Sequence, residues 1–388
     1  MQEVTLTING QEVRVRAGTT VLEAAQAAGV TIPTLCHHRD LTPVGACRLC
    51  VVEVEGSRLL QAACTLPVAD GMVVQTESPA VVEARRFVLE MLLSDHPNDC
   101  MTCEVNGDCE LQDWVYHYQV AWPEHGGRRH RYPVDSDPNP VVFVDLNKCI
   151  LCGRCVRACA EIQGRHVWGF GYRGFETKLI AGADQTMLEA RCESCGQCVA
   201  YCPTGALFDK MSLGWGRIYE QKQVITTCAY CGVGCQFILN VRDNRITRVT
   251  SYFDAPVNGA ALCVKGRYGY DYIHHPDRLT RPLVRARWLD PVQVEERVTS
   301  GEWCVVKDGR PTYDPQSAAH NPDAFIETDW DTALDVVARR FAETKARYGS
   351  GAFAVLASAK CTNEENYLFN KFTRQVLGTN NIDHCARL

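Results

Sequence analysis

Residues 149–159 read CILCGRCVRAC, and residues 192–202 return to the same spacing as CESCGQCVAYC. Both runs have the form C-x2-C-x2-C-x3-C. Gaps of two or three residues let several soft thiolates converge on one point, and an iron–sulfur cluster needs that convergence. The repeat therefore predicts a compact, cysteine-rich unit of two similar halves over residues 139–212.

This spacing is that of the bacterial ferredoxins, in which the fourth cysteine of each run ligates the other of two [4Fe–4S] clusters. We therefore expect two crossed ligand sets in a 2×[4Fe–4S] ferredoxin-like domain. The first set is Cys149, Cys152, Cys155 and Cys202, and the second is Cys192, Cys195, Cys198 and Cys159. Zinc sites are the alternative that this rhythm disfavours.

Composition extends the interpretation to the whole chain. The 388 residues include 22 cysteines, of which 19 precede residue 264. The first residues contain neither the basic nor the apolar segment of a secretory signal, so metal binding is favoured over disulfides and a cytoplasmic location is expected. No apolar run reaches the roughly 18 residues of a membrane span. The net charge of -6 gives no support for nucleic-acid binding.

The N-terminal residues predict a small sheet domain. Residues 3–16 alternate apolar and polar side chains around Asn9-Gly10, which predicts a β-hairpin. Thr20 and Glu23 form a capping box for a helix. The four cysteines that follow are Cys36, Cys47, Cys50 and Cys64. A β-grasp domain over residues 1–78 that binds a [2Fe–2S] cluster is expected, with structural zinc as the alternative.

A second cysteine group follows a predicted helix from Ser78-Pro79 to Ser94. The apolar face expected for this helix is Val81, Ala84, Val88, Met91 and Leu92. After it come His96, Cys100, Cys103 and Cys109. A lone histidine here would be an ordinary surface residue, but this rhythm favours a one-His/three-Cys [4Fe–4S] domain over residues 79–120. Since an imidazole removes a negative charge, this cluster should be easier to reduce.

The fourth cysteine group lies in a predicted [4Fe–4S] domain over residues 221–277. Its members are Cys228, Cys231, Cys235 and Cys263. Lys265 follows on an expected Gly-bounded loop. From the sequence pattern alone, it is predicted to be an ordinary solvent-exposed charge. The remaining cysteines, at positions 304, 361 and 385, are interpreted as free thiols.

The last part of the chain predicts the beginning of an α/β domain over residues 278–388. Residues 290–326 resemble an exposed insertion. Thr328 is the predicted start of a helix to Tyr348, a short strand follows, and Thr362 is the predicted cap of another helix. The expected fold class is therefore α+β multidomain, with four iron–sulfur domains followed by the start of an α/β domain.

Several stretches resemble known families. Residues 1–215 resemble the N-terminal region shared by the large iron–sulfur subunit of respiratory complex I, the electron-transfer subunit of NAD-reducing hydrogenases and the iron-only hydrogenases. From residue 221 the chain resembles the molybdopterin oxidoreductases and, within them, the formate dehydrogenase α subunit. The motifs are CAYCGVGC at 228–235, CVKGRYG at 263–269, SAKCTNEENYL at 358–368 and GTNNIDHCARL at 378–388.

The resemblance implies a molybdenum or tungsten ion held by two pyranopterin guanine dinucleotides, where formate is oxidised reversibly to CO2. It implies that Lys265 relays electrons between the fourth cluster and the pterin, and that Lys360 and Asn363 contact the pterin. One [2Fe–2S] and four [4Fe–4S] clusters would then carry single electrons toward the N-terminal domains. The implied partner is a flavin- and NAD-binding diaphorase-type subunit, a ferredoxin or a hydrogenase.

Two other functions remain as alternatives. The chain could be an electron-transfer-only subunit of an NAD-reducing hydrogenase or complex I-like assembly, and its molybdenum or tungsten content would separate this function from the first. An iron-only hydrogenase fits less well, because the Cys228 group and Lys265 match the pterin family.

A final expectation concerns the end of the chain. In formate dehydrogenases the segment similar to residues 383–388 runs directly into the cysteine or selenocysteine that ligates the metal. We therefore expect the 388-residue chain alone to lack the complete active site. The hypothesis is an in-frame UGA codon at position 389, with an ordinary fragment as the alternative, and sequencing past codon 388 would decide between them.

Overall fold

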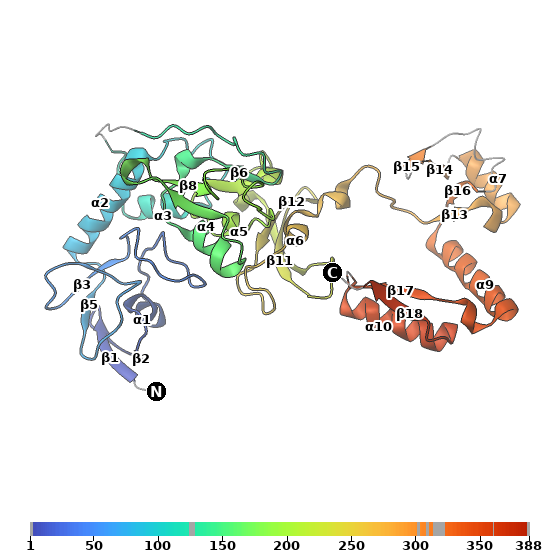
Figure 1. Cartoon of the computed structure of the whole chain (residues 1–388), viewed down its shortest axis with the longest axis horizontal. Coiled ribbons are helices and arrows are strands. Elements are labelled where there is room, and N and C mark those ends of the chain that lie inside the picture. The colour runs from blue at the N-terminus through green and yellow to red at the C-terminus, as the bar shows by residue number, and fades with distance from the viewer. Residues whose placement is uncertain are drawn as a thin grey trace. The chain divides into compact units, whose positions relative to one another are not determined.

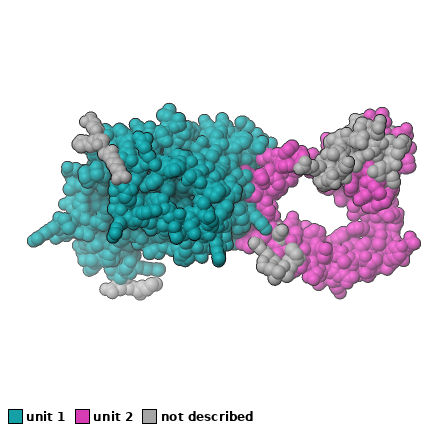
Figure 2. All heavy atoms as spheres, turned by 45° about the horizontal axis from the view of Figure 1, so that its top comes forward, with its two compact units in different colours: residues 1–227, 235–268 teal, residues 228–234, 269–388 magenta. Residues whose placement is uncertain are grey.

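The computed structural model describes residues 3–123, 129–300, 303–307, 310–312, 323–359 and 361–385. The chain divides into two compact units (Figures 1 and 2). Unit 1 comprises Met1–Thr227 and Cys235–Tyr268, and unit 2 comprises Cys228–Gly234 and Gly269–Leu388. None of the helices in the described ranges is both long and apolar enough to cross a lipid bilayer.

The N-terminal part of unit 1 is a mixed five-stranded sheet packed against one helix (Figure 1). The strands, in the order β2-β1-β5-β3-β4, are β1 (Glu3–Ile8), β2 (Gln11–Arg16), β3 (Val51–Val54), β4 (Gln61–Ala62) and β5 (Val73–Gln75). The predicted hairpin is confirmed because β1 and β2 pair antiparallel, while β5 runs parallel to β1. Helix α1 (Val21–Ala27) begins with the predicted capping box of Thr20 and Glu23.

Helix α2 (Pro79–Asp95) buries a different face from the one that its apolar pattern predicts. Ser78 caps it and Pro79 is its first residue, as expected. The buried positions are Val81, Arg85, Leu89 and Leu93. Met91, placed on the apolar face by sequence, is about half exposed. The expected face was therefore wrong in part, because an arginine occupies the centre of the buried stripe.

Arg85 is fully buried between α2 and the N-terminal sheet. Its guanidinium donates to Oε1 of Glu77 at 2.5 Å, to the Tyr118 hydroxyl at 2.6 Å and to the Val51 carbonyl at 2.9 Å. Helix α3 (Glu110–His117) ends directly before Tyr118. These partners offset the cost of burying a charge, which explains why a polar residue lies on the inner face.

The cysteine-rich repeat folds as two similar halves. Helix α4 (Arg154–Arg157) continues into a π-helical turn, Ala158–Ile162, and the equivalent helix is α5 (Gln197–Ala200). Each helix follows a left-handed glycine, Gly153 at φ 71° and Gly196 at φ 70°, a conformation that favours glycine. The antiparallel pairs are β6 (Val142–Val144) with β9 (Leu207–Asp209) and β7 (Trp168–Gly171) with β8 (Lys178–Ala181).

The last part of unit 1 is a three-stranded antiparallel sheet. Its strands are β10 (Lys222–Thr227), β11 (Gln236–Arg242) and β12 (Arg245–Ser251), and helix α6 (Val264–Tyr268) follows. Residues 228–234, between β10 and β11 in sequence, belong to unit 2.

Unit 2 contains a small four-stranded sheet of order β13-β16-β14-β15. Its elements are β13 (Leu283–Arg285), α7 (Pro291–Ser300), β14 (Trp303–Lys307), β15 (Arg310–Thr312) and β16 (Phe325–Glu327). Ile326 of β16 is fully buried in a cluster with Val284 and Val336. The described parts of residues 290–326 therefore contribute to a folded core, which corrects the expectation of an exposed insertion.

The remaining elements are a long helix followed by a βαβ unit. They are α9 (Trp330–Tyr348), β17 (Val355–Ser358), α10 (Asn363–Phe372), a π-helical turn Thr373–Leu377, and β18 (Ile382–Cys385), and α10 connects β17 to β18. Strands β17 and β18 pair in parallel, which confirms the predicted α/β alternation. Thr362 caps α10 as predicted, but the cap of α9 is Asp329 and not Thr328. The Asp329 carboxylate accepts a hydrogen bond from the N–H of Thr332 at 2.7 Å.

Candidate functional site

The four cysteines of the N-terminal sheet domain share one hydrogen-bonded network. Hydrogen bonds from Cys47 and Cys64 lower the pKa of the Cys36 thiol to about 2, and one from Cys64 lowers the pKa of Cys50 to about 7. The same bonds raise the pKa of Cys47 and of Cys64. The predicted set is thus brought together, and its sulfurs are close enough to converge on a small cluster.

The histidine of the second group has a neutral, partly buried imidazole. Burial lowers the pKa of His96 to about 4, so its ring is neutral at pH 7. The Nδ1 atom of His96 is buried and has no hydrogen-bond partner in the described part of the chain. Cys103 and Cys109 are buried and Cys100 is partly buried. A buried, neutral nitrogen without a hydrogen-bond partner fits the ligand role predicted for His96, and the convergence of this group stays a prediction.

The crossed pattern expected for the repeat has a counterpart in the structure. One small cavity is lined by all four cysteines of the first set, including the distant Cys202. In the second set, backbone N–H groups point at sulfur: Val167 donates to Cys159 Sγ at 3.3 Å and Ser194 to Cys192 Sγ at 3.3 Å. Such donors stabilise thiolate or cluster sulfur. The residues therefore fit two [4Fe–4S] clusters.

Two cysteines of the second group contact the segment that directly follows Cys202. The thiol of Cys109 donates to the Pro203 carbonyl at 3.7 Å, and a Cβ atom on Gly205 would lie 3.0 Å from Cys103 Sγ. Among the described residues, no three His, Cys, Asp or Glu side chains gather tightly enough to hold a single metal ion. A cluster of several irons spaces its ligands more widely than one ion does.

The fourth cysteine group is divided between the two units. Cys228 and Cys231 belong to unit 2, whereas Cys235 and Cys263 belong to unit 1. Lys265 is exposed and lies in helix α6, which corrects the expectation of a Gly-bounded loop. The convergence of these four thiolates stays a prediction.

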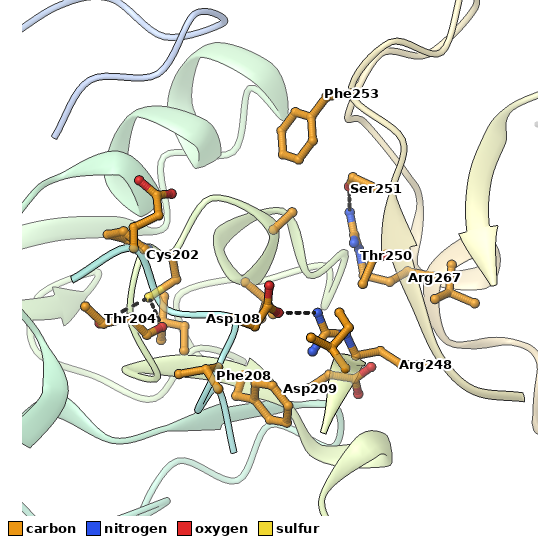
Figure 3. A pocket seen from close by; sticks show the side chains of 18 of the residues that line it. Asp108, Cys202, Thr204, Phe208, Asp209, Arg248, Thr250, Ser251, Phe253 and Arg267 are labelled. Carbon is orange, nitrogen blue, oxygen red and sulfur yellow. Dashed lines mark hydrogen bonds and ion pairs between the residues drawn. The ribbon is translucent and has the colours of Figure 1, made fainter. Parts of the chain in front are cut away.

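A polar cavity of about 370 Å³ lies inside unit 1 (Figure 3). Arg248 forms an ion pair with Asp108 at 3.4 Å on its wall. Asp209 Oδ2 and the Tyr268 hydroxyl are buried on the same wall and have no hydrogen-bond partner among the described residues. Burial raises the pKa of Asp209 to about 6. The cavity is large and polar enough to hold ordered water.

In unit 2, the loop after Cys231 packs on the segment that precedes α10. The N–H of Gly232 donates to the Ala359 carbonyl at 3.3 Å, and a Cβ atom on Gly232 would lie 3.2 Å from Asn363 Oδ1. The structure therefore places Gly232, the residue after Cys231, against Asn363. Lys360, the other predicted pterin contact, lies outside the described residues.

A cavity of about 280 Å³ lies beside the carboxyl end of β17. Its polar lining consists of Ser358, Asn366, Asn370, Asp383 and His384. Asn366 also fixes the strand end, because its amide donates to the Ser358 carbonyl at 3.2 Å. Ligands of parallel sheets bind outside the carboxyl ends of the strands, so this position suits a cofactor.

Three buried arginines beside the cysteine motifs were missed by the sequence argument, which followed cysteine spacing alone. They are Arg154, Arg157 and Arg267. Arg154 pairs with both carboxylate oxygens of Glu110, at 2.5 and 2.8 Å. Their position within or next to a cysteine motif is the signal that could have identified them. An apolar residue would pack there more easily, so an arginine at such a position indicates a buried charge with specific partners.

Comparisons with protein families identify the kinds of domain along the chain. Family models match a 2Fe-2S iron–sulfur cluster binding domain at residues 1–79, an NADH-ubiquinone oxidoreductase-G iron–sulfur binding region at 85–122 and an NADH-quinone oxidoreductase subunit 3 ferredoxin-like domain at 139–208. Further models match a molybdopterin oxidoreductase Fe4S4 domain at 221–275 and a molybdopterin oxidoreductase domain at 278–388. The chain therefore matches iron–sulfur domain models over most of residues 1–275 and a molybdopterin oxidoreductase model over residues 278–388.

Several curated relatives extend well beyond this chain. An NADPH-Fe(3+) oxidoreductase subunit alpha of Geobacter sulfurreducens is 37% identical, across 99% of this chain and 40% of the relative. An NADH-quinone oxidoreductase subunit of Rhizobium meliloti is 36% identical over the same shares. A Staphylococcus aureus protein provisionally named formate dehydrogenase is 30% identical, across 100% of this chain and 39% of the relative. The chain thus spans about 40% of the length of these relatives.

Proposed function

We propose that the chain is the iron–sulfur and pterin-binding part of a formate dehydrogenase. It would oxidise formate reversibly to CO2 and pass the electrons to a flavin- and NAD-binding partner subunit. The observation that carries the proposal is the contact between Gly232, next to Cys231, and Asn363. This contact joins a cysteine motif for one-electron transfer to a stretch that resembles the pterin-contacting segment of formate dehydrogenases.

The proposed ligands are those of the five cysteine groups. The [2Fe–2S] ligands are Cys36, Cys47, Cys50 and Cys64, and the [4Fe–4S] sets are His96 with Cys100, Cys103 and Cys109; Cys149, Cys152, Cys155 and Cys202; Cys192, Cys195, Cys198 and Cys159; and Cys228, Cys231, Cys235 and Cys263. When bound, these clusters supply one-electron transfer, and a molybdenum or tungsten bis(pyranopterin guanine dinucleotide) supplies the two-electron chemistry of formate.

Residues of this chain would hold and separate those groups. Lys265 lies in α6, two residues after Cys263. Its side chain is exposed and is not part of a buried core. This placement supports a role in electron relay over a role in folding. Asn363 and Asn366 would hydrogen-bond the pterin cofactor near the carboxyl end of β17.

A second candidate is an electron-transfer subunit without formate chemistry. It is favoured by the matches of residues 85–122 and 139–208 to models of NADH-ubiquinone and NADH-quinone oxidoreductase subunits, and by relatives named for NADPH-Fe(3+) and NADH-quinone activity. The formate assignment rests on the motif at residues 358–368 and on the Staphylococcus aureus relative.

Metal analysis and formate-driven reduction distinguish the two candidates. The full-length gene product, purified anaerobically, should contain about one molybdenum or tungsten per chain, and formate should reduce its clusters in EPR spectra. Lys265→Ala should keep the iron content and slow this reduction, whereas Lys222→Ala, at another exposed lysine, should not. Iron alone, with no response to formate, would contradict the proposal and favour the second candidate.

A further inference from the structure

Arg157 lies in α4 between two predicted ligands, and its side chain is buried among backbone carbonyls. One nitrogen of its guanidinium, Nη2, donates to the carbonyl of Cys36 at 2.5 Å and to the carbonyl of Cys152 at 3.3 Å. Cys36 belongs to the proposed [2Fe–2S] set and Cys152 to a proposed [4Fe–4S] set. A single nitrogen therefore joins the ligand loops of two different proposed clusters. Cys36 is 121 residues from Arg157 in sequence, and Cys152 is 5 residues from it.

The other arms of the guanidinium fix its position. Nη1 donates to the Thr42 carbonyl at 2.6 Å, and Nε donates to the Gly153 carbonyl at 3.2 Å. These four acceptors are neutral carbonyl oxygens on the two cysteine-bearing loops. The positive charge is therefore held between the loops by a rigid, planar group that lysine could not imitate.

The contact is part of a built interface within unit 1. The N–H of Thr42 donates to Glu161 Oε2 at 2.8 Å, and the Tyr201 hydroxyl donates to Asp40 Oδ2 at 3.2 Å. Leu41 is buried in an apolar cluster with Ala158 and Tyr201. The loop after Cys36 thus rests on the helices of the repeat, so the position of Arg157 does not depend on one side chain alone.

We propose that Arg157 is a positioning residue that couples the [2Fe–2S] cluster to the [4Fe–4S] cluster of Cys149, Cys152, Cys155 and Cys202. Its charge lies near both clusters and stabilises their reduced forms, because a buried positive charge favours added negative charge. Its Nη2 atom completes a hydrogen-bonded route from the Cys152 carbonyl to the Cys36 carbonyl.

When both clusters are bound, one electron would pass along this route from the four-iron cluster to the two-iron cluster. The first is oxidised by one electron and the second is reduced by one; no bond forms or breaks, and Arg157 keeps its proton. The inference rests on the ligand sets of the proposed function, and it does not depend on formate as the electron source.

Arg157→Gln tests the effect of the charge. In the full chain, reconstituted anaerobically and titrated with dithionite, the reduction equilibrium of both clusters should shift about tenfold toward the oxidised form, which is about 59 mV for a one-electron couple. EPR reports the potential of each cluster separately, so the readout does not require catalysis. Unchanged potentials at full iron content would overturn the proposal.

Arg157→Lys tests the hydrogen-bonded route. The variant keeps the charge, so both potentials should stay near the native values, while rapid freeze-quench EPR should show slower reduction of the [2Fe–2S] cluster by the neighbouring one. A native rate would overturn the proposed route. This variant also keeps the proposal testable if Arg157→Gln fails to take up iron.

Arg267→Gln is the matched control. Arg267 is equally buried, and its Nε donates at 2.8 Å to the carbonyl of Cys195, a proposed ligand of the other repeat cluster. This variant should shift that other cluster and leave the [2Fe–2S] potential unchanged; a shift of the [2Fe–2S] potential equal to that in Arg157→Gln would contradict the proposal. A native chain that lacks the [2Fe–2S] signal would refute the ligand assignment itself, a result that is distinct from unshifted potentials.

Discussion

The thiol of Cys109 lies 3.7 Å from the carbonyl oxygen of Pro203, although 94 residues separate the two in sequence. Pro203 directly follows Cys202, so one peptide unit joins the second predicted ligand set to the third. The N–H of Glu110, the residue after Cys109, donates to the same carbonyl at 3.1 Å and holds this segment in place. An electron passing between the two sets would need to cross very little protein.

The crossed ligation of the repeat predicts a specific pattern of iron loss. Cys202→Ser should remove one [4Fe–4S] cluster, about four irons per chain, because a cavity joins Cys202 to the first run. The double variant Cys149→Ser/Cys202→Ser should lose no more iron than either single variant. Cys192→Ser/Cys202→Ser should lose about twice as much. Iron and sulfide analysis with EPR checks this, and the reverse pattern would show that each run ligates its own cluster.

His96 as a ligand predicts a change in potential without a loss of iron. His96→Cys should keep the cluster and lower its reduction potential, because a thiolate adds the negative charge that the neutral imidazole lacks. Redox titration monitored by EPR measures the shift. His117→Cys, at an exposed position near the end of α3, should leave the potential unchanged. An unaltered titration curve in His96→Cys would rule out the ligand role.

The two left-handed glycines of the repeat predict unequal responses to the same substitution. A Cβ atom on Gly153 would lie 3.5 Å from Phe170, whereas one on Gly196 would clash with the Arg267 Cδ and Tyr268 hydroxyl atoms. Both variants to alanine bear the left-handed strain of about 1–2 kcal/mol, and Gly196→Ala adds about 1–3 kcal/mol of overpacking. Thermal unfolding should therefore show a larger decrease in Tm for Gly196→Ala; equal decreases would contradict the close packing around Gly196.

The buried Asp209 predicts a pH-dependent cost to stability. Burial raises the pKa of its carboxyl to about 6 from 3.8, so the folded protein holds this proton more tightly than the unfolded chain does. The free energy of unfolding is therefore highest below pH 3.8, where this carboxyl is protonated in both states. It decreases as pH rises from 3.8 to about 6, and above that it stays lower by roughly 3 kcal/mol.

Relative to the native protein, Asp209→Asn should therefore be stabilised more at pH 7.5 than at pH 4. Chemical denaturation at both pH values measures this difference. Asp243→Asn, at a side chain that is 94% exposed, is the control and should show little change. An Asp209→Asn variant with the same pH dependence as the native protein would contradict the shifted pKa.

Local features of the fold were predictable from sequence, and distant partners were not. The hairpin at residues 3–16 and the capping box of Thr20 follow from short-range rules, and both are present. Arg85 was not predicted to be buried, because its partners Val51 and Tyr118 lie 34 and 33 residues away. A helical pattern counts apolar residues and contains no information about such partners.

The candidate sites follow the same division. Cysteine spacing identified the groups that the structure brings together around Cys36 and around Cys152, because ligand spacing is a local property. It could not identify Arg157, whose contact with Cys36 spans 121 residues, or the contact between Gly232 and Asn363. These contacts depend on how separately folded segments pack.

The pairing of β6 with β9 holds the two ends of the repeat side by side, so the chain between them forms a closed loop. With the crossed ligand sets proposed, the two clusters act as interlaced cross-links at the base of that loop. Closing such a loop costs only about 0.6 kcal/mol more for each doubling of its length. The exposed turn between β7 and β8, near residues 173–176, is therefore a position where the chain can gain length at little thermodynamic cost while the cluster-bearing base stays unchanged.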